Sequence, residues 1–125
     1  MKVSSIMNAV ETVDPDLRLR EAVKIMSEKG IGSLVIIEDK KILGIITERD
    51  VLKNVNRLDL KVEDIMSDKV ITIDANESID EAASLMNKYK IKRIPVTKKG
   101  ILVGIITATD LIANAEEIEE DFFFE

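Results

Sequence analysis

The chain repeats itself. When the sequence is aligned with itself at a shift of 60 positions, Val10 pairs with Val70, and the segment GIITERD at residues 44–50 pairs with GIITATD at residues 104–110. The same shift aligns Thr12 with Thr72, Asp14 with Asp74, Glu21 with Glu81, Ala22 with Ala82, Met26 with Met86 and Ile31 with Ile91. Near the start the shift becomes 59 and pairs Val3, Ile6 and Met7 with Val62, Ile65 and Met66. A duplication of this extent restricts the chain to two copies of one structural unit.

Each copy predicts the same order of elements. A short turn precedes an apolar strand at residues 10–13 or 70–73. An amphipathic helix follows, because apolar residues recur with the spacing i, i+3, i+4, i+7. In the first copy these residues are Leu19, Ala22, Val23 and Met26, and in the second they are Ile79, Ala82, Ala83 and Met86. Ser78 and Glu81 form a capping box for the second helix, whereas Arg18 occupies the corresponding position in the first.

Two short apolar runs complete each copy before a last helix. The runs cover residues 33–37 and 42–47, then 94–97 and 101–107, and their β-branched residues and intervening turns predict paired strands. The last helix begins at Glu48 or Ala108. The predicted fold class is therefore α+β, with a βαββα unit occurring twice.

The boundaries we expect are residues 1–57 for the first repeat, 58–115 for the second and 116–125 for a tail. The segment NRLDL at residues 56–60 joins the copies and is too short for them to be independent. Two units of about 60 residues bury too little surface alone, so we expect them to pack together.

Composition excludes several classes of protein. The chain has no cysteine and no histidine, so it lacks thiolate and imidazole metal ligands and any Ser-His or Cys-His nucleophile. Its net charge of −6 comes from the tail, which has six acids, so 18 acids (24 − 6) face 18 bases elsewhere. This neutral body argues against non-specific nucleic-acid binding. Because no apolar run approaches 18 residues, we expect a soluble, cytoplasmic protein that does not enter membranes.

Both copies place Gly, Ile-Ile, Thr and Asp where a strand passes into a helix. Thr47 with Asp50, and Thr107 with Asp110, have the spacing of a capping box, which is a purely structural role. The same geometry also suits a ligand, since free N–H groups at a helix start attract anions and a carboxylate accepts hydrogen bonds from both hydroxyls of a cis-diol such as ribose. The two roles are compatible.

These residues resemble the CBS domain pair, or Bateman module, named after cystathionine beta-synthase. The resemblance covers residues 3 to about 112 and is carried by the doubled VxxIM opening, the helices EAVKIM and EAASLM, the strands GSLVI and KRIPV, and the doubled GIITxxD. It implies two βαββα repeats packed sheet to sheet about a pseudo-two-fold axis. It also implies two clefts that hold AMP, ADP, ATP or S-adenosylmethionine as regulatory ligands, with no cofactor required for chemistry.

The resemblance further implies which residues bind the ligand. Asp50 and Asp110 would hold the ribose, with each site completed by the opposite copy. The first expected site comprises Thr47, Arg49, Asp50, Val70, Ile71, Lys92 and Arg93. The second comprises Val10, Glu11, Gly32, Ser33, Thr107, Thr109 and Asp110. Because Lys92 and Arg93 would face phosphate only at the first site, we expect it to bind phosphate-bearing adenine nucleotides more tightly.

The expected function is a stand-alone regulatory module, not an enzyme, that senses an adenosine-type ligand and acts on a separate target protein, as a homodimer by analogy. One alternative is a structural dimerisation adaptor with empty clefts, in which the threonines and aspartates serve only as caps. Another is a nucleic-acid-binding protein that uses the basic stretch at residues 88–99. We expect Phe122–Phe124 in the tail to dock on a dimer partner or another protein, or to be disordered.

Overall fold

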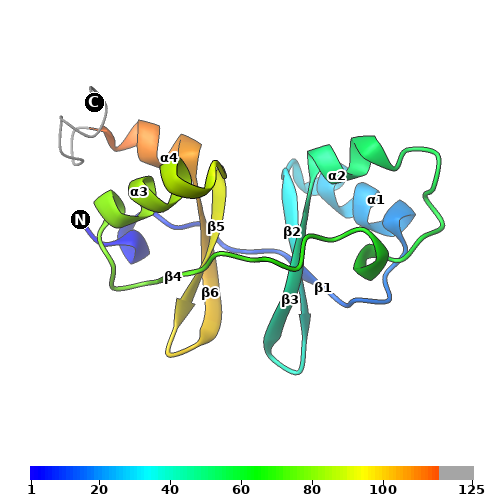
Figure 1. Cartoon of the computed structure of the whole chain (residues 1–125), viewed down its shortest axis with the longest axis horizontal. Coiled ribbons are helices and arrows are strands. Elements are labelled where there is room, and N and C mark those ends of the chain that lie inside the picture. The colour runs from blue at the N-terminus through cyan, green and yellow to red at the C-terminus, as the bar shows by residue number, and fades with distance from the viewer. Residues whose placement is uncertain (116–125) are drawn as a thin grey trace. The chain divides into compact units, whose positions relative to one another are not determined.

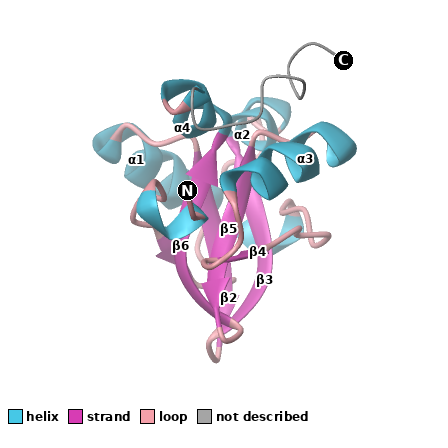
Figure 2. Ribbon diagram, turned by 90° about the vertical axis from the view of Figure 1, so that its left-hand side faces the viewer, coloured by secondary structure: helices cyan, strands magenta, loops and turns pink. Residues whose placement is uncertain are grey.

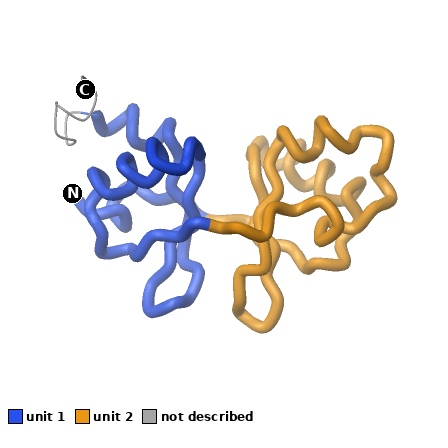
Figure 3. The backbone as a smooth tube through the Cα atoms, viewed as in Figure 1, with its two compact units in different colours: residues 1–9, 71–125 blue, residues 10–70 orange. Residues whose placement is uncertain are grey.

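The computed structural model describes residues 1–115, and these residues form two compact units (Figure 3). Unit 2 is one continuous segment, Val10–Val70, whereas unit 1 combines Met1–Ala9 with the chain from Ile71 onwards. The chain therefore passes from one unit to the other twice, next to Val10 and next to Val70. The compact units do not begin where the sequence repeats begin.

Unit 2 contains the predicted βαββα order (Figure 1). Its elements are β1 (Thr12–Val13), α1 (Leu19–Lys29), β2 (Ser33–Glu38), β3 (Lys41–Thr47), α2 (Glu48–Lys53) and the 3-10 turn η2 (Val62–Asp64). The sheet order is β1-β2-β3, with β1 parallel and β3 antiparallel to β2. The first strand is shorter than predicted, because only Thr12 and Val13 pair with β2.

Unit 1 repeats this arrangement, and Figure 2 distinguishes its helices from its strands by colour. Its elements are η1 (Val3–Ser5), β4 (Ile73–Asp74), α3 (Ile79–Tyr89), β5 (Arg93–Lys98), β6 (Ile101–Thr107) and α4 (Ala108–Ala113). The sheet order is β4-β5-β6, again with one parallel and one antiparallel pair. The predicted α+β class and the starts of α2 and α4 are confirmed.

Each unit has its own apolar core. Branched aliphatic side chains of the sheet meet the apolar stripe of the first helix, as the periodicity predicts. In unit 2 the fully buried residues include Leu19, Leu34, Ile36, Ile46 and Val62. In unit 1 they include Val3, Ile79, Ile94, Val96 and Ile106. Met26 and Met86 are buried in these cores, which confirms their predicted packing role.

The turn that opens each sequence repeat packs in the unit of the other repeat. Val3 belongs to the core of unit 1, where its amide donates to the Glu77 carbonyl at 2.8 Å. Val62 belongs to the core of unit 2, where its amide donates to the Leu17 carbonyl at 2.8 Å. The two copies have thus exchanged their leading segments, and the N-terminus completes the unit that holds the second half of the chain.

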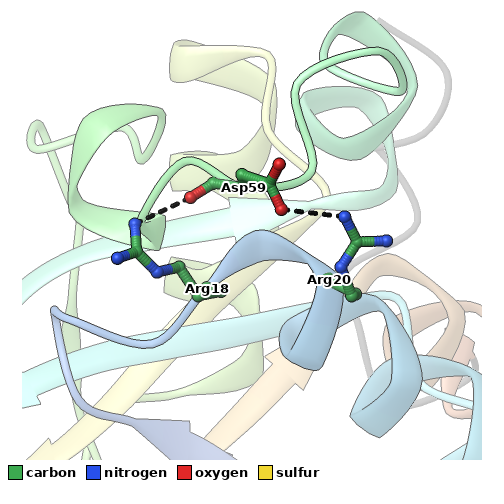
Figure 4. Close-up of polar contacts among 3 residues, drawn as sticks. All are labelled: Arg18, Arg20 and Asp59. Carbon is green, nitrogen blue, oxygen red and sulfur yellow. Dashed lines mark hydrogen bonds and ion pairs between the residues drawn. The ribbon is translucent and has the colours of Figure 1, made fainter.

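The start of α1 lacks a side-chain cap and is completed by the linker instead. The free amides of Leu19 and Arg20 donate to the carbonyls of Leu60 and Leu58, at 2.7 and 3.0 Å. Arg18 donates to the Asp59 carbonyl at 2.8 Å, and Arg20 forms an ion pair with the Asp59 carboxylate at 2.8 Å (Figure 4). The short linker thus provides the hydrogen-bond acceptors that a capping side chain normally supplies.

The Arg20 guanidinium hydrogen-bonds the Asp59 carboxylate and, with its positive charge, lowers the pKa of that carboxyl below its ordinary value. Because both side chains are exposed, we expect the ion pair to add little stability. By contrast, α3 has one half of the predicted capping box, in which the Ser78 hydroxyl accepts from the Glu81 amide at 3.1 Å.

Candidate functional site

The two predicted aspartates occupy equivalent positions: Asp50 is the third residue of α2, and Asp110 is the third residue of α4. In unit 2, the Thr47 amide donates to Asp50 Oδ2 at 2.8 Å, and the Thr47 hydroxyl donates to the same oxygen at 3.2 Å. In unit 1, the Thr107 amide and hydroxyl both donate to Asp110 Oδ2 at 2.8 Å. The predicted capping contact is therefore present in both units.

The second oxygen of each carboxylate is not used by these caps. Within residues 1–115, Asp50 Oδ1 and Asp110 Oδ1 accept no hydrogen bond from the protein. Both aspartates are only partly buried. Since an ionised carboxylate has about four acceptor positions, each side chain can cap its helix and still accept hydroxyl groups of a ligand.

A glycine in β3 and in β6 allows another segment of the same unit to pack against the strand. A Cβ atom on Gly44 would lie 2.7 Å from the Ser67 carbonyl oxygen, and one on Gly104 would lie 2.9 Å from the Asn8 carbonyl oxygen. Ser67 and Ile45 exchange two backbone hydrogen bonds, each 3.0 Å long. Asn8 and Ile105 exchange the equivalent pair, at 2.8 and 3.0 Å. The absence of a side chain at these glycines thus lets Ser67 pair with β3, which leads to Asp50, and lets Asn8 pair with β6, which leads to Asp110.

The structure adds one residue that the sequence prediction missed. Asn8 Nδ2 donates to Asp110 Oδ2 at 2.8 Å. The shift of 59 positions aligns Asn8 with Ser67, but the Ser67 hydroxyl donates to no side chain within the described residues. The only signal in the sequence was this Asn-to-Ser difference directly after the doubled Ile-Met, and the contact with Asp110 required the backbone pairing to be known.

The other predicted site residues lie near the two aspartates or on the connections between units. In unit 2, Ser33 pairs with Thr47 in the β2–β3 ladder, and the Gly32 carbonyl accepts from the Glu48 amide at 3.1 Å. In unit 1, Arg93 pairs with Thr107 in the β5–β6 ladder, and the Lys92 carbonyl accepts from the Ala108 amide at 2.8 Å. Each unit therefore places these residues beside its own threonine. The role of Lys92 and Arg93 in the site of Asp50, and of Gly32 and Ser33 in the site of Asp110, stays a prediction.

The remaining predicted residues have simpler surroundings. Arg49 and Thr109 are exposed on the first turns of α2 and α4. The Glu11 carboxylate forms an ion pair with Lys29 at 2.8 Å, and the Glu11 backbone carbonyl accepts a hydrogen bond from the Val35 amide. Val10 and Val70 mark the two ends of unit 2, and Ile71 begins the return to unit 1; all three are partly buried.

The basic stretch at residues 88–99 is distributed over several elements. Lys88 lies in the last turn of α3, with its Nζ atom 5.2 Å from the ring centre of Tyr89. Lys98 ends β5, Lys99 follows it in the turn, and both are exposed. Lys90 caps α3 in the left-handed conformation, where unit 2 has Gly30. Its lysines therefore occupy different parts of unit 1 and do not follow a single helix face.

An apolar hollow of about 400 Å³ lies between α1 and α2. It is lined by Val23, Met26, Ser27, Gly30, Ile31, Glu48, Val51 and Leu52. None of the predicted ligand-binding residues lines it. Among residues 1–115, no group of three or more acidic side chains is arranged to hold a metal ion, and no helix has the length and apolar character needed to span a bilayer.

The fold and the two aspartates define a class: a duplicated α+β module with one threonine-held carboxylate in each copy. The CBS domain family model matches residues 3–57 and 62–117, which include almost all of both repeats. The chain belongs to the CBS domain family and is a tandem CBS domain pair.

Known proteins similar to this chain include both solved structures and longer enzymes. The solved CBS domain pair of protein MJ0100, in complex with 5′-methylthioadenosine and S-adenosyl-L-methionine, is 31% identical with a TM-score of 0.85, covering 93% of this chain and 96% of that one. CBS domain-containing protein YhcV of Bacillus subtilis (strain 168) is 28% identical over 84% of this chain and 78% of YhcV.

Inosine-5′-monophosphate dehydrogenase of Korarchaeum cryptofilum (strain OPF8) is 39% identical over 86% of this chain. Protein MJ1232 of Methanocaldococcus jannaschii is 34% identical over 90% of it. The chain spans only 23% of that dehydrogenase and 38% of MJ1232. The match to both proteins is thus a match to a CBS domain pair within a longer polypeptide.

Proposed function

We propose that this CBS domain pair is a regulatory module that binds an adenosine-type ligand through Asp50 and Asp110. The observation that carries the proposal is the state of the two carboxylates, each of which uses one oxygen to cap a helix and leaves the other without a protein donor. A carboxylate of this kind can accept hydrogen bonds from the two hydroxyls of a ribose. The complex of the MJ0100 domain pair with two adenosyl compounds supports adenosine as the class of ligand.

The ligand acts as a regulator and is not transformed. Each carboxylate, with one oxygen engaged in its helix cap, accepts hydrogen bonds from the sugar hydroxyls and holds the ligand in place. Ligand binding can change the state of the protein only through a difference in affinity between its conformations. The module then passes this change to a target protein.

AMP, ADP, ATP and S-adenosylmethionine are the candidate ligands, and phosphate is what distinguishes them chemically. Lys92 and Arg93 are the cations that the family resemblance assigns to phosphate at the Asp50 ligand, with no cation at the corresponding positions Gly32 and Ser33. We expect Lys92→Ala and Arg93→Ala to weaken AMP and ATP binding and to leave adenosine binding unchanged. Equal loss for adenosine would contradict a phosphate contact.

A thermal-shift screen tests the proposed function. Wild-type protein is heated with each of the four candidates, and a ligand at 100 times its dissociation constant adds about 2.7 kcal/mol to the free energy of unfolding. Asp50→Asn and Asp110→Asn keep an oxygen for the helix cap but remove the charge, so they should reduce the shift without unfolding the protein. No shift with any candidate would contradict the proposal and favour the structural adaptor.

We also propose that the chain forms a homodimer through the apolar side chains on α1 and α2. Leu52 is 71% exposed at the rim of the hollow between these helices, and Val55 just after α2 is 57% exposed. Exposed apolar side chains next to an apolar hollow favour contact with another protein surface. Sedimentation of wild type and Leu52→Glu provides the test, since the substitution should yield monomers. A monomeric wild type would contradict it.

A further inference from the structure

The two aspartates differ in the number of hydrogen bonds they accept. Asp50 Oδ2 accepts two, both from Thr47, and the one from the hydroxyl is long at 3.2 Å. Asp110 Oδ2 accepts three, each 2.8 Å long, and the third comes from the Asn8 side chain. Each of these hydrogen bonds lies within a single unit. Thr47 and Asp50 belong to unit 2, whereas Asn8, Thr107 and Asp110 belong to unit 1.

The backbone that presents the third donor is the same in both units. Asn8 pairs with Ile105 and Ser67 pairs with Ile45, each through two hydrogen bonds. Each pairing lies over a glycine whose Cβ would collide with the carbonyl of the paired residue. The difference between the aspartates therefore comes from one side chain, since an asparagine amide reaches the carboxylate whereas the shorter serine hydroxyl makes no such contact.

Three donors exceed the two lone pairs of a carboxylate oxygen, so Asp110 Oδ2 has no free acceptor capacity. A hydroxyl that approaches this oxygen must first displace the Asn8 amide, which is possible because Asn8 is exposed. At Asp50, only the long bond from the Thr47 hydroxyl has to yield. The Asp50 carboxylate is thus the more accessible of the two to a pair of hydroxyls.

We propose that Asn8 is a specificity-determining residue that makes the two carboxylates unequal toward a sugar diol. Asp50 receives the two hydroxyls with both of its oxygens, whereas Asp110 receives them through Oδ1 alone because Asn8 occupies Oδ2. This inference rests on the proposed function, and it adds a preference that depends on the sugar and not on phosphate. Adenosine, which has the diol but no phosphate, is therefore the probe.

A reciprocal exchange of the two side chains tests the proposal. Asn8→Ser in an Asp50→Asn background examines the Asp110 carboxylate alone, and calorimetric titration should show adenosine binding about fivefold more tightly than in the Asp50→Asn parent. Ser67→Asn in an Asp110→Asn background examines Asp50 alone and should weaken adenosine binding by about the same factor.

The preference between adenosine and 2′-deoxyadenosine is the readout that a merely structural role of Asn8 would not change. Asn8→Ser should increase this preference and Ser67→Asn should decrease it. Thermal melts of the ligand-free variants verify folding, and each exchange introduces a side chain that the other unit already carries in the same backbone position.

The possible failures are distinguishable. If the parents bind adenosine and neither exchange alters affinity or preference, the role of Asn8 is overturned while the proposed function stands. Weaker binding after Asn8→Ser would also overturn it, because Asn8 would then be a ligand contact. If wild type binds neither adenosine nor any nucleotide of the thermal-shift screen, the proposed function is overturned and this inference with it.

Discussion

Gly44 and Gly104 illustrate how a single missing atom determines where a distant segment packs. Neither glycine has a positive φ angle, so glycine is needed at these positions for space and not for backbone conformation. A side chain would occupy the volume of residues 66–67 at Gly44 or of residues 7–8 at Gly104, the segments that pair with the strands. The sequence showed these glycines as part of the GIITxxD repeat, but their contacts with residues 7–8 and 66–67 depend on the fold. The same limit explains why Asn8 was not predicted.

Gly104→Ala should destabilise the protein by about 1–3 kcal/mol, the usual cost of overpacking. The added Cβ would lie 2.8 Å from the Met7 sulfur, which can move, and 2.9 Å from the Asn8 carbonyl oxygen, which is fixed by pairing with Ile105. Urea unfolding measures the change, with Ser84→Ala on the exposed side of α3 as the control. A cost below about 0.5 kcal/mol, typical of surface positions, would contradict the close approach.

The Thr-Asp pairs show what could be predicted at this scale. Their spacing alone indicated a capping contact, and both contacts are present, with equal bonds of 2.8 Å from the threonine amides and a longer hydroxyl bond at Asp50 than at Asp110. Their second role, as acceptors for a sugar, stays a proposal because a capping box has the same sequence whether or not a ligand binds. The distinction depends on the oxygens that the caps leave free.

The elements follow from periodicity, but their assignment to compact units does not. Helical spacing located α1 and α3, and β-branched runs located β2, β3, β5 and β6. Nothing local in VSSIM or VEDIM indicates that each turn packs with the opposite half of the chain. That outcome depends on which core has room for Val3 and for Val62.

Val3→Ala and Val62→Ala should each cost about 2 kcal/mol, because both side chains are fully buried. Because the leading segments are exchanged, Val3→Ala should destabilise unit 1 and Val62→Ala should destabilise unit 2. Hydrogen exchange should quicken around Ile94–Val96 for Val3→Ala and around Leu34–Ile36 for Val62→Ala. The opposite pattern, with each substitution acting on the repeat that follows it in sequence, would show that the segments are not exchanged.

The linker cap on α1 predicts a pH-dependent contribution to stability. Arg20 lowers the pKa of Asp59 below its ordinary value of 3.8, so folding is favoured by the ionised carboxyl. This contribution is complete above the unfolded pKa, near pH 4, and disappears as the pH falls through the lower, folded-state value.

Unfolding of wild type and Asp59→Asn in urea between pH 2 and pH 7 should therefore show wild type slightly more stable at neutral pH and equal to the variant at the acidic end. The effect is small because the carboxyl is fully exposed. Arg20→Gln should remove the same increment. A difference that grows toward low pH would contradict the assigned direction.

For the whole molecule, the order of elements in each copy predicted the fold class, and the duplication predicted that this order occurs twice, as the two sheets of identical topology show. It could not predict the capping of α1, because Leu58 and Leu60 act there through backbone carbonyls that any residue carries. The predicted ligand sets combine residues of unit 1 with residues of unit 2, and this combination stays a proposal. The acidic and phenylalanine-rich tail at residues 116–125 lies outside the described residues.

The most direct test of the account is the dependence of binding on the sugar hydroxyls. Calorimetric titration of wild type should show adenosine binding at least about tenfold more tightly than 2′,3′-dideoxyadenosine, because only adenosine carries the 2′- and 3′-hydroxyls that donate to the carboxylates. In the Asp50→Asn/Asp110→Asn double variant this preference should shrink to less than about twofold. Equal affinity of wild type for the two nucleosides would contradict the claim that Asp50 and Asp110 hold a sugar.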